Sequence, residues 1–172
     1  MGFLFALKGL TMDFQTLLEL HLKDPEKRFK GVLLALDPGE TTGWTIFKDG
    51  KFKVCGQIKT WPIADGVTNL AMLLDTHSPD HVVFERYGIY KWKTETHSNS
   101  DVPTLQVIGM IKTLCILESD IPYSMQTAQI AKGFCTDQKL KDWGFWESGQ
   151  RHARDAIRHA CYYLLFRPKN DS

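Results

Sequence analysis

The sequence Leu33-Leu34-Ala35-Leu36-Asp37-Pro38-Gly39-Glu40-Thr41-Thr42-Gly43-Trp44 decides the fold, because it joins two strand-like runs through a turn that begins with an acid. The apolar run 33–36 predicts a buried strand, and residues 42–47 predict a second one. A carboxylate at the end of a buried strand is costly unless a cation meets it, and a metal ion would meet that need. Asp-Pro-Gly also forms ordinary turns in which the Asp only caps the backbone. This stretch alone leaves both interpretations of Asp37 open.

The composition predicts one ordinary globular domain with a sizeable core, since the 172 residues are 43% hydrophobic and 24% charged. The net charge of +1 provides no general basic field, so any binding of nucleic acid must come from local clusters. The four cysteines lie far apart, which argues against a zinc cage or a disulfide framework and predicts a reducing setting.

No apolar run approaches the length of a membrane span, so we expect no membrane partner. Residues 1–10 are apolar but lack the basic leader and the small-residue cleavage site of a secretory signal. We therefore expect a protein of the cytoplasm.

Hydrophobic spacing and turn signals divide the chain into an N-terminal extension, residues 1–30, and a main domain, residues 31–172. In the extension Thr11 is the expected cap of a helix over Met12–Leu22. In the domain, Asp49-Gly50 between two strand-like runs predicts a hairpin. The expected strands are Val32–Leu36, Thr42–Phe47, Phe52–Ile58, His81–Phe84 and Tyr123–Met125. The expected helices are Asp65–Thr76, Val102–Glu118, one through Ile130 and Phe134, Thr136–Trp143 and Gln150–Phe166.

This order of elements predicts the fold class. Three consecutive strands joined by tight turns form an antiparallel meander, and the later strands alternate with helices. The sequence therefore predicts an α/β fold with a mixed five-stranded sheet, three antiparallel strands and then parallel strands, flanked by helices.

Acidic residues end two of the predicted strands, and the last helix adds further polar groups. Asp37 follows the first strand and Glu85 the fourth, so both carboxylates meet at one edge if these strands are neighbours. His152 and Asp155 share one face of the last helix, and His159 continues that face. Clustered carboxylates repel one another unless divalent cations bind between them. Each residue also has a plain structural explanation, as a strand-end acid or as a member of a helix-surface ion pair.

The same residues carry a family resemblance that covers roughly Val32 to Leu165. Asp-Pro-Gly-x-Thr-Thr-Gly-Trp at 37–44, Phe84-Glu85 at a strand end, and His-Ala-Arg-Asp-Ala at 152–156 resemble the RuvC-type Holliday junction resolvases, especially their small phage-like members. The resemblance implies a ribonuclease-H-like fold and a homodimer that cuts four-way DNA junctions. It implies Mg²⁺ or Mn²⁺, two ions per active site, and no small-molecule cofactor. It also implies a bacterial or phage-infected cell as the setting.

By this resemblance Asp37, Glu85 and Asp155 are catalytic metal ligands. His152 stands where many members carry a fourth Asp and some carry His, so it either binds a metal or transfers protons. The nearly all-round apolar helix Val102–Glu118 is the expected dimer interface.

Two further groups of residues are candidates for DNA binding. The loop after Glu85 interleaves aromatic residues with lysines: Tyr87, Tyr90, Lys91, Trp92 and Lys93. Aromatic rings stack on unpaired bases while lysines meet phosphates, although the same rings could equally seal a core or a dimer contact. The second group is a basic stripe beside the proposed metals, formed by Lys132, Arg151, Arg154 and Arg158.

Three other functions remain open on the sequence. A flap nuclease, or another nuclease that processes branched DNA or RNA, would use the same acids. The Asp-x-Gly-x-Thr-Thr-Gly pattern also resembles the phosphate-binding turn of actin-like ATPases, which need two such domains where this chain supplies one. A non-catalytic binding module of the same fold would not need the full acid set.

Overall fold

The structure is a computed structural model that describes residues 12–87, 102–117 and 120–167. Within these ranges it contains five strands, six α-helices and one short 3-10 helix. In chain order the elements are α1 (Phe14–His21), η1 (Pro25–Lys27), β1 (Val32–Asp37), β2 (Thr41–Lys48), β3 (Lys51–Lys59), α2 (Ile63–His77), β4 (His81–Arg86), α3 (Pro103–Leu117), β5 (Tyr123–Thr127), α4 (Ala128–Phe134), α5 (Asp137–Asp142) and α6 (Arg151–Phe166). No helix in the described ranges is long and apolar enough to cross a membrane.

The strands form one sheet in the order β3-β2-β1-β4-β5. The neighbours β3, β2 and β1 are antiparallel, whereas β4 runs parallel to β1 and β5 runs parallel to β4. The predicted mixed sheet of three antiparallel strands followed by parallel strands is confirmed. Its central strand is β1, which ends on Asp37.

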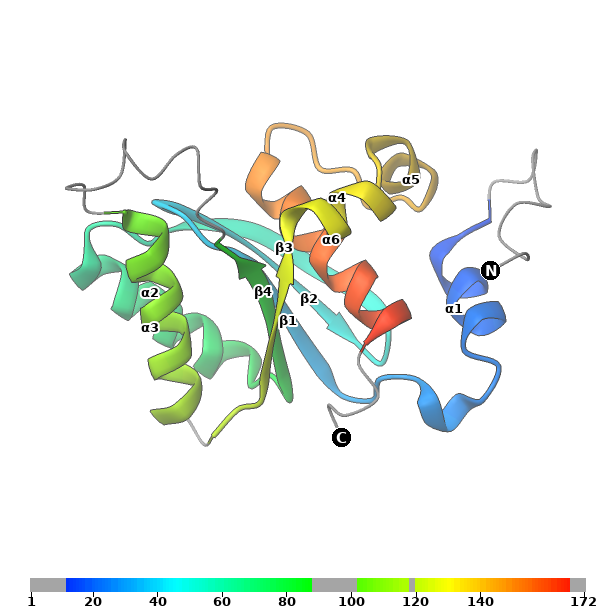
Figure 1. Cartoon of the computed structure of the whole chain (residues 1–172), viewed down its shortest axis with the longest axis horizontal. Coiled ribbons are helices and arrows are strands. Elements are labelled where there is room, and N and C mark those ends of the chain that lie inside the picture. Colours follow the sequence, from blue (N-terminus) through cyan, green and yellow to red (C-terminus); the bar gives the residue numbers. More distant parts are fainter. Residues whose placement is uncertain (1–11, 88–101, 118–119, 168–172) are drawn as a thin grey trace.

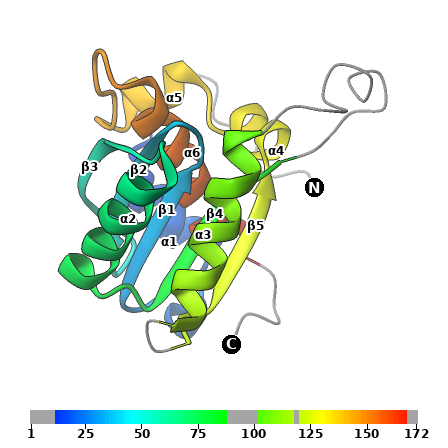
Figure 2. The same cartoon turned by 90° about the vertical axis from the view of Figure 1, so that its left-hand side faces the viewer.

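Helices cover both faces of the sheet. In Figure 1, α2 and α3 lie on one side, and α6, α4 and α5 lie on the other. Figure 2 shows α2 and α3 in front of the sheet. Successive residues of a strand point to opposite faces, so Leu34 and Leu36 join the cluster under α2 and α3, while Leu33 and Ala35 join the cluster under α6. The core is therefore divided by the sheet into two clusters.

The described part of the N-terminal extension packs onto the sheet domain. Phe14 and Leu18 of α1 are buried in the α6-side cluster, and Phe14 contacts the ring of Trp143 at 5.0 Å between centroids. Asp13, rather than the expected Thr11, is the residue that caps α1. Its carboxylate accepts hydrogen bonds from the backbone N–H groups of Gln15 and Thr16, and Thr11 lies outside the described residues.

The hairpin of β2 and β3 contains an irregularity that matters for the site. Phe47 pairs with Phe52, but Ile46 pairs with Val54, so Lys53 is an extra residue on β3. A bulge of one residue reverses the faces to which all later side chains of that strand point. Beyond it, Gln57 lies opposite Gly43 on the α6 side of the sheet.

Candidate active site

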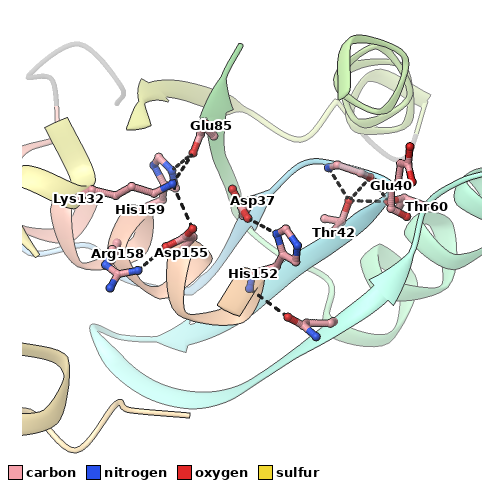
Figure 3. A network of polar contacts seen from close by, with 12 residues as sticks. Asp37, Glu40, Thr42, Thr60, Glu85, Lys132, His152, Asp155, Arg158 and His159 are labelled. Carbon is pink, nitrogen blue, oxygen red and sulfur yellow. Dashed lines mark hydrogen bonds and ion pairs between the residues drawn. The ribbon is translucent and has the colours of Figure 1, made fainter. Parts of the chain in front are cut away.

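The two strand-end acids lie on the same face of the sheet because of strand alternation. Asp37 shares the parity of Leu33 and Ala35, and Glu85 shares that of Val83, so both belong to the face that α6 covers. The parallel strands β1 and β4 are paired up to Leu36 and Phe84, and the acids follow at the next position of each strand. Figure 3 shows both carboxylates facing α6.

Helix α6 brings His152 and Asp155 to this edge. His152 Nδ1 lies 2.8 Å from Asp37 Oδ2, a distance at which an Nδ1–H donates to a carboxylate. The first turn of α6 lies directly against β2, since a Cβ on Gly43 would stand 2.0 Å from the backbone of His152. A residue larger than glycine at position 43 would therefore push His152 away from Asp37.

A glutamine from the neighbouring strand caps this end of α6. The helix receives no side-chain cap from its own N-cap residue, Gln150. The backbone N–H of His152 instead donates to Oε1 of Gln57 at 3.0 Å. This long-range cap satisfies one of the donors that every helix start leaves open, and it ties His152 to β3.

Two buried threonines fix the turn that follows Asp37. The hydroxyl of Thr60 donates to the backbone oxygen of Gly39 at 2.5 Å, and it lies 2.7 Å from the hydroxyl of Thr42. Both threonines are fully buried. They join the Asp-Pro-Gly turn to the end of β3, so the polar residues of the turn stabilise the backbone that carries Asp37 (Figure 3).

Cations surround Asp155 on α6. Arg158 forms ion pairs with Asp155 and with Asp137 of α5, and its Nε donates to the backbone oxygen of Cys135 at 2.9 Å. Lys132 of α4 has its Nζ 3.1 Å from Asp155 Oδ2 and 3.9 Å from Glu85 Oε2. The ammonium of Lys132 therefore bridges the acid on α6 and the acid on β4.

The electrostatic environments of the two strand-end acids differ. Burial raises the pKa of Asp37; the hydrogen bond with His152 opposes this shift, and the negative charges of Glu85 and Asp155 add to it. Burial also acts to raise the pKa of Glu85, but the hydrogen bond from His159 and the charge of Lys132 outweigh it and hold that pKa below its usual value. Neighbouring acids with divergent pKa values are typical of functional sites.

Similarity to known proteins is found in the structure of the chain and not in its sequence. A scan against models of known protein families finds no match, and a search of curated proteins finds none. Among solved structures, Thermus thermophilus RuvC in complex with Holliday junction substrate aligns with a TM-score of 0.60 at 16% identity, over 79% of this chain and 94% of that one. Another structure of the same protein gives 0.58 at 17% identity, over 78% and 94%.

The chain has the RuvC fold. The yeast mitochondrial Holliday junction resolvase Ydc2 shares it, with a TM-score of 0.52 at 13% identity over 87% of this chain and 85% of that one. The ribonuclease-H-like sheet expected from the sequence is thereby confirmed. The structural alignment extends over almost all of RuvC.

The acid cluster fits a divalent cation by its chemistry. Carboxylate oxygens are the preferred ligands of Mg²⁺, and Asp37, Glu85 and Asp155 meet at one edge of the RuvC fold with a protein cation, Lys132, already between two of them. The three acids lie near one another without forming a closed ion site, because no three His, Cys, Asp or Glu side chains among the described residues are grouped closely enough to hold an ion together. Binding of an ion between Glu85 and Asp155 would require the Lys132 ammonium to leave.

A polar pocket opens beside the cluster. It has a volume of about 260 Å³ and its lining includes four cationic side chains: Lys132, Arg151, Arg154 and Arg158. Arg154 is held in place, because its guanidinium lies 4.4 Å from the ring centre of Trp146 and donates to the backbone oxygen of Glu147. The structure thus brings together the four residues of the predicted basic stripe. Arg158 is buried and already paired, whereas Lys132 and Arg151 are exposed.

The aromatic loop predicted for DNA binding is described only at its first residue. Tyr87 is half-buried and packs against the cluster under α2 and α3. Tyr90, Lys91, Trp92 and Lys93 lie outside the described residues. The stacking role of this loop stays a prediction.

Sequence reasoning placed His159 on the face of Asp155 without assigning it a partner, and it missed Gln126 and Gln57 altogether. His159 is fully buried, and its ring contacts Gln126 and Glu85. Its position one turn after Asp155, on the same face, was a usable signal. Gln126 and Gln57 carried none, because their roles depend on strand register rather than on any local motif.

Proposed function

We propose that this chain is a metal-dependent endonuclease that cleaves four-way DNA junctions. One observation carries the proposal: Asp37 and Glu85 from neighbouring strands and Asp155 from α6 meet on the RuvC fold, with His152 bonded to Asp37. One solved structure with this fold is a complex with Holliday junction substrate. A passive binding module would not need to bear the cost of clustered acids.

In this proposal Asp37, Glu85, Asp155 and His152 hold Mg²⁺ or Mn²⁺, two ions per site. The ions would activate a water molecule and stabilise the leaving oxygen of the scissile phosphodiester. Asp37 orients His152 through Nδ1, which leaves Nε2 of a side chain that is 43% exposed to bind metal or to move a proton. Gln57 and the Thr42–Thr60 pair hold these two residues in register.

The basic pocket is proposed to receive DNA phosphate next to the scissile bond. Lys132, Arg151 and Arg154 supply the cations, and Trp146 together with the Glu147 backbone orients Arg154 in advance. Arg158 contributes mainly by fixing Asp155. The loop from Tyr87 to Lys93 is proposed to contact bases near the junction centre.

A homodimer is proposed because a four-way junction has two symmetric strands to cut and each chain has one site. The helix α3 supports it: Ile116 is 60% exposed, Leu117 is 73% exposed and Leu105 is 42% exposed, although all three are apolar. The neighbouring helix α2 adds exposed Met72 and Val67. Exposed apolar groups on adjacent helices are suited to pairing of two copies. In the full proposal residues 31–172 form the nuclease domain, residues 1–30 extend it, and the protein acts in the cytoplasm of a bacterial or phage-infected cell.

A cleavage panel tests the proposal. Purified protein is incubated with Mg²⁺ or Mn²⁺ and with four-way, flap, single-stranded and RNA substrates, and the products are mapped. We expect paired, symmetric cuts in the four-way junction, loss of cleavage without metal, and loss of cleavage in Asp37→Asn with junction binding retained. Lys53→Met, at an exposed site near the other end of the sheet, should cut normally. Preferred cleavage of flaps or RNA would replace the junction assignment, and metal-dependent cleavage by Asp37→Asn would contradict the assigned site.

A further inference from the structure

The most informative group that the proposed chemistry does not use is a histidine buried behind the acid cluster. His159 lies on α6 one turn after Asp155 and has no exposed surface. Its Nε2 is 3.3 Å from Glu85 Oε2, and its Nδ1 is 3.1 Å from the side-chain amide of Gln126 (Figure 3 shows His159 beside Glu85). A polar ring is costly to bury unless both nitrogens have partners, and here both do.

The three residues come from three elements that meet at one place. Glu85 and Gln126 are register partners on the parallel strands β4 and β5. His159 reaches both from α6. The hydrogen-bonded series Gln126–His159–Glu85 therefore joins the C-terminal ends of two strands to the helix that carries His152 and Asp155.

The hydrogen-bond directions follow from the partners. A carboxylate oxygen only accepts, so the ring donates Nε2–H to Glu85. An amide can present either its oxygen or its nitrogen to Nδ1 by a half-turn, and the donation to Glu85 is the same in both cases. His159 and Lys132 both contact Oε2 of Glu85, so Oε1 takes part in neither contact.

We propose that His159, held by Gln126, is a positioning residue that fixes the Glu85 carboxylate through Oε2 and so presents Oε1 to the metal. The inference rests on the proposed function, because it assigns a role toward that same metal site. Groups that orient a ligand from behind change metal affinity by about 10- to 100-fold when they are removed. A histidine that served only to fill the core would change stability without this selective effect on metal binding.

The test measures Mn²⁺ binding by the full chain without DNA, by titration calorimetry, together with the melting temperature. His159→Leu removes the donor and keeps an apolar filling, whereas His159→Gln keeps an N–H at a similar reach. The matched control is His81→Leu. His81 is also a buried histidine of the sheet domain that bonds to β5, through Ser124 at 3.0 Å, but it lies at the opposite end of β4 from Glu85.

We expect His159→Leu to weaken Mn²⁺ binding by about 10- to 100-fold, and His159→Gln to restore most of it. His81→Leu should bind Mn²⁺ as the wild type does, even if it melts at a similarly reduced temperature. Gln126→Leu, at a half-buried strand position that leaves α6 unchanged, should also weaken binding, and it keeps the proposal testable if His159→Leu does not fold.

Three results would overturn the inference. The first is an unchanged Mn²⁺ affinity in folded His159→Leu or in Gln126→Leu. The second is that His159→Gln loses as much Mn²⁺ affinity as His159→Leu. The third is that His81→Leu loses as much Mn²⁺ affinity as His159→Leu. If the wild type binds Mn²⁺ and Asp37→Asn weakens that binding, such a result removes only the role of His159. If the wild type binds no Mn²⁺, the proposed metal site and the inference fall together.

Discussion

Replacing Lys132 by methionine should make the metal-free protein less stable and the metal site tighter. The ammonium lies 3.1 Å from Asp155 and 3.9 Å from Glu85, so it neutralises two acids that would otherwise repel each other. A divalent cation between the same two acids would occupy the same space. Lysine and metal therefore compete, and methionine keeps the length of the side chain without its charge.

The magnitude follows from the distances. A pair of unit charges at 4 Å interacts by about 4 kcal/mol at the effective dielectric near a protein surface. The Lys132 side chain is 42% exposed, and solvent and salt screen such a pair substantially, so a net of about 1–2 kcal/mol is reasonable. For a domain of this size that lowers the melting temperature by about 2–8 °C. In the wild type the ion must displace Lys132, which loses this interaction of about 1–2 kcal/mol. In Lys132→Met nothing has to be displaced, so Mg²⁺ should bind about 5- to 30-fold more tightly.

The assay is thermal unfolding across a Mg²⁺ titration, because ligand binding raises stability by mass action. Lys132→Met should start below the wild type without Mg²⁺ and converge with it at saturation. Lys53→Met, on the exposed bulge of β3, controls for the loss of one positive charge. Equal melting temperatures without metal, or unchanged Mg²⁺ affinity, would refute the competition. Junction cleavage by the variant should fall all the same, because the basic pocket loses a cation.

Three other outcomes are expected. Asp37→Asn should raise the melting temperature of the metal-free protein at pH 7. Burial raises the pKa of Asp37, so the ionised carboxylate destabilises the folded state at that pH. The difference in melting temperature between the variant and the wild type should vanish as the pH falls towards 3.8 and below, where the carboxyl becomes protonated in both the folded and the unfolded state. Gln57→Ala removes the cap of α6 and should cost about 0.5–2 kcal/mol in urea denaturation; a loss of stability with full cleavage would deny that the cap positions His152. Arg158→Ala leaves buried Asp155 with one fewer partner and should cost about 3–5 kcal/mol in the same assay, whereas a change below about 1 kcal/mol would mean that Asp155 is well solvated.

The fold was predictable because its signals are local. Four apolar residues before Asp37, an Asp-Gly turn at 49–50 and helical spacing after Ile63 each specify one element, and the resulting order admits few sheet topologies. The sequence pattern places Asp37 and Glu85 at the ends of two strands. That they lie on one face of the sheet depends on the register of β1 and β4, in which Leu36 pairs with Phe84.

The supporting residues were not predictable, and Gln57 explains why. A regular hairpin closed by Asp49-Gly50 would place Gly56 opposite Gly43 and turn Gln57 away from α6. The extra residue Lys53 shifts the register by one and reverses the faces, which brings Gln57 under the helix. No local pattern announces that bulge. His159 is similar, since only the pairing of β4 with β5 shows that Gln126 lies beside Glu85.

The division of the core by the sheet has a consequence for how this protein can change. Every described polar group of the acid cluster lies on the α6 side, which also contains the cluster around Tyr163 and Ile157. The cluster under α2 and α3 contains none of these groups among its buried side chains. A substitution under α6 must therefore preserve both the packing of the core and the polar contacts of the acid cluster. The buried part of the α2–α3 layer can change its packing while the acid cluster keeps its geometry, and only its exposed apolar face is held by the proposed pairing of two copies.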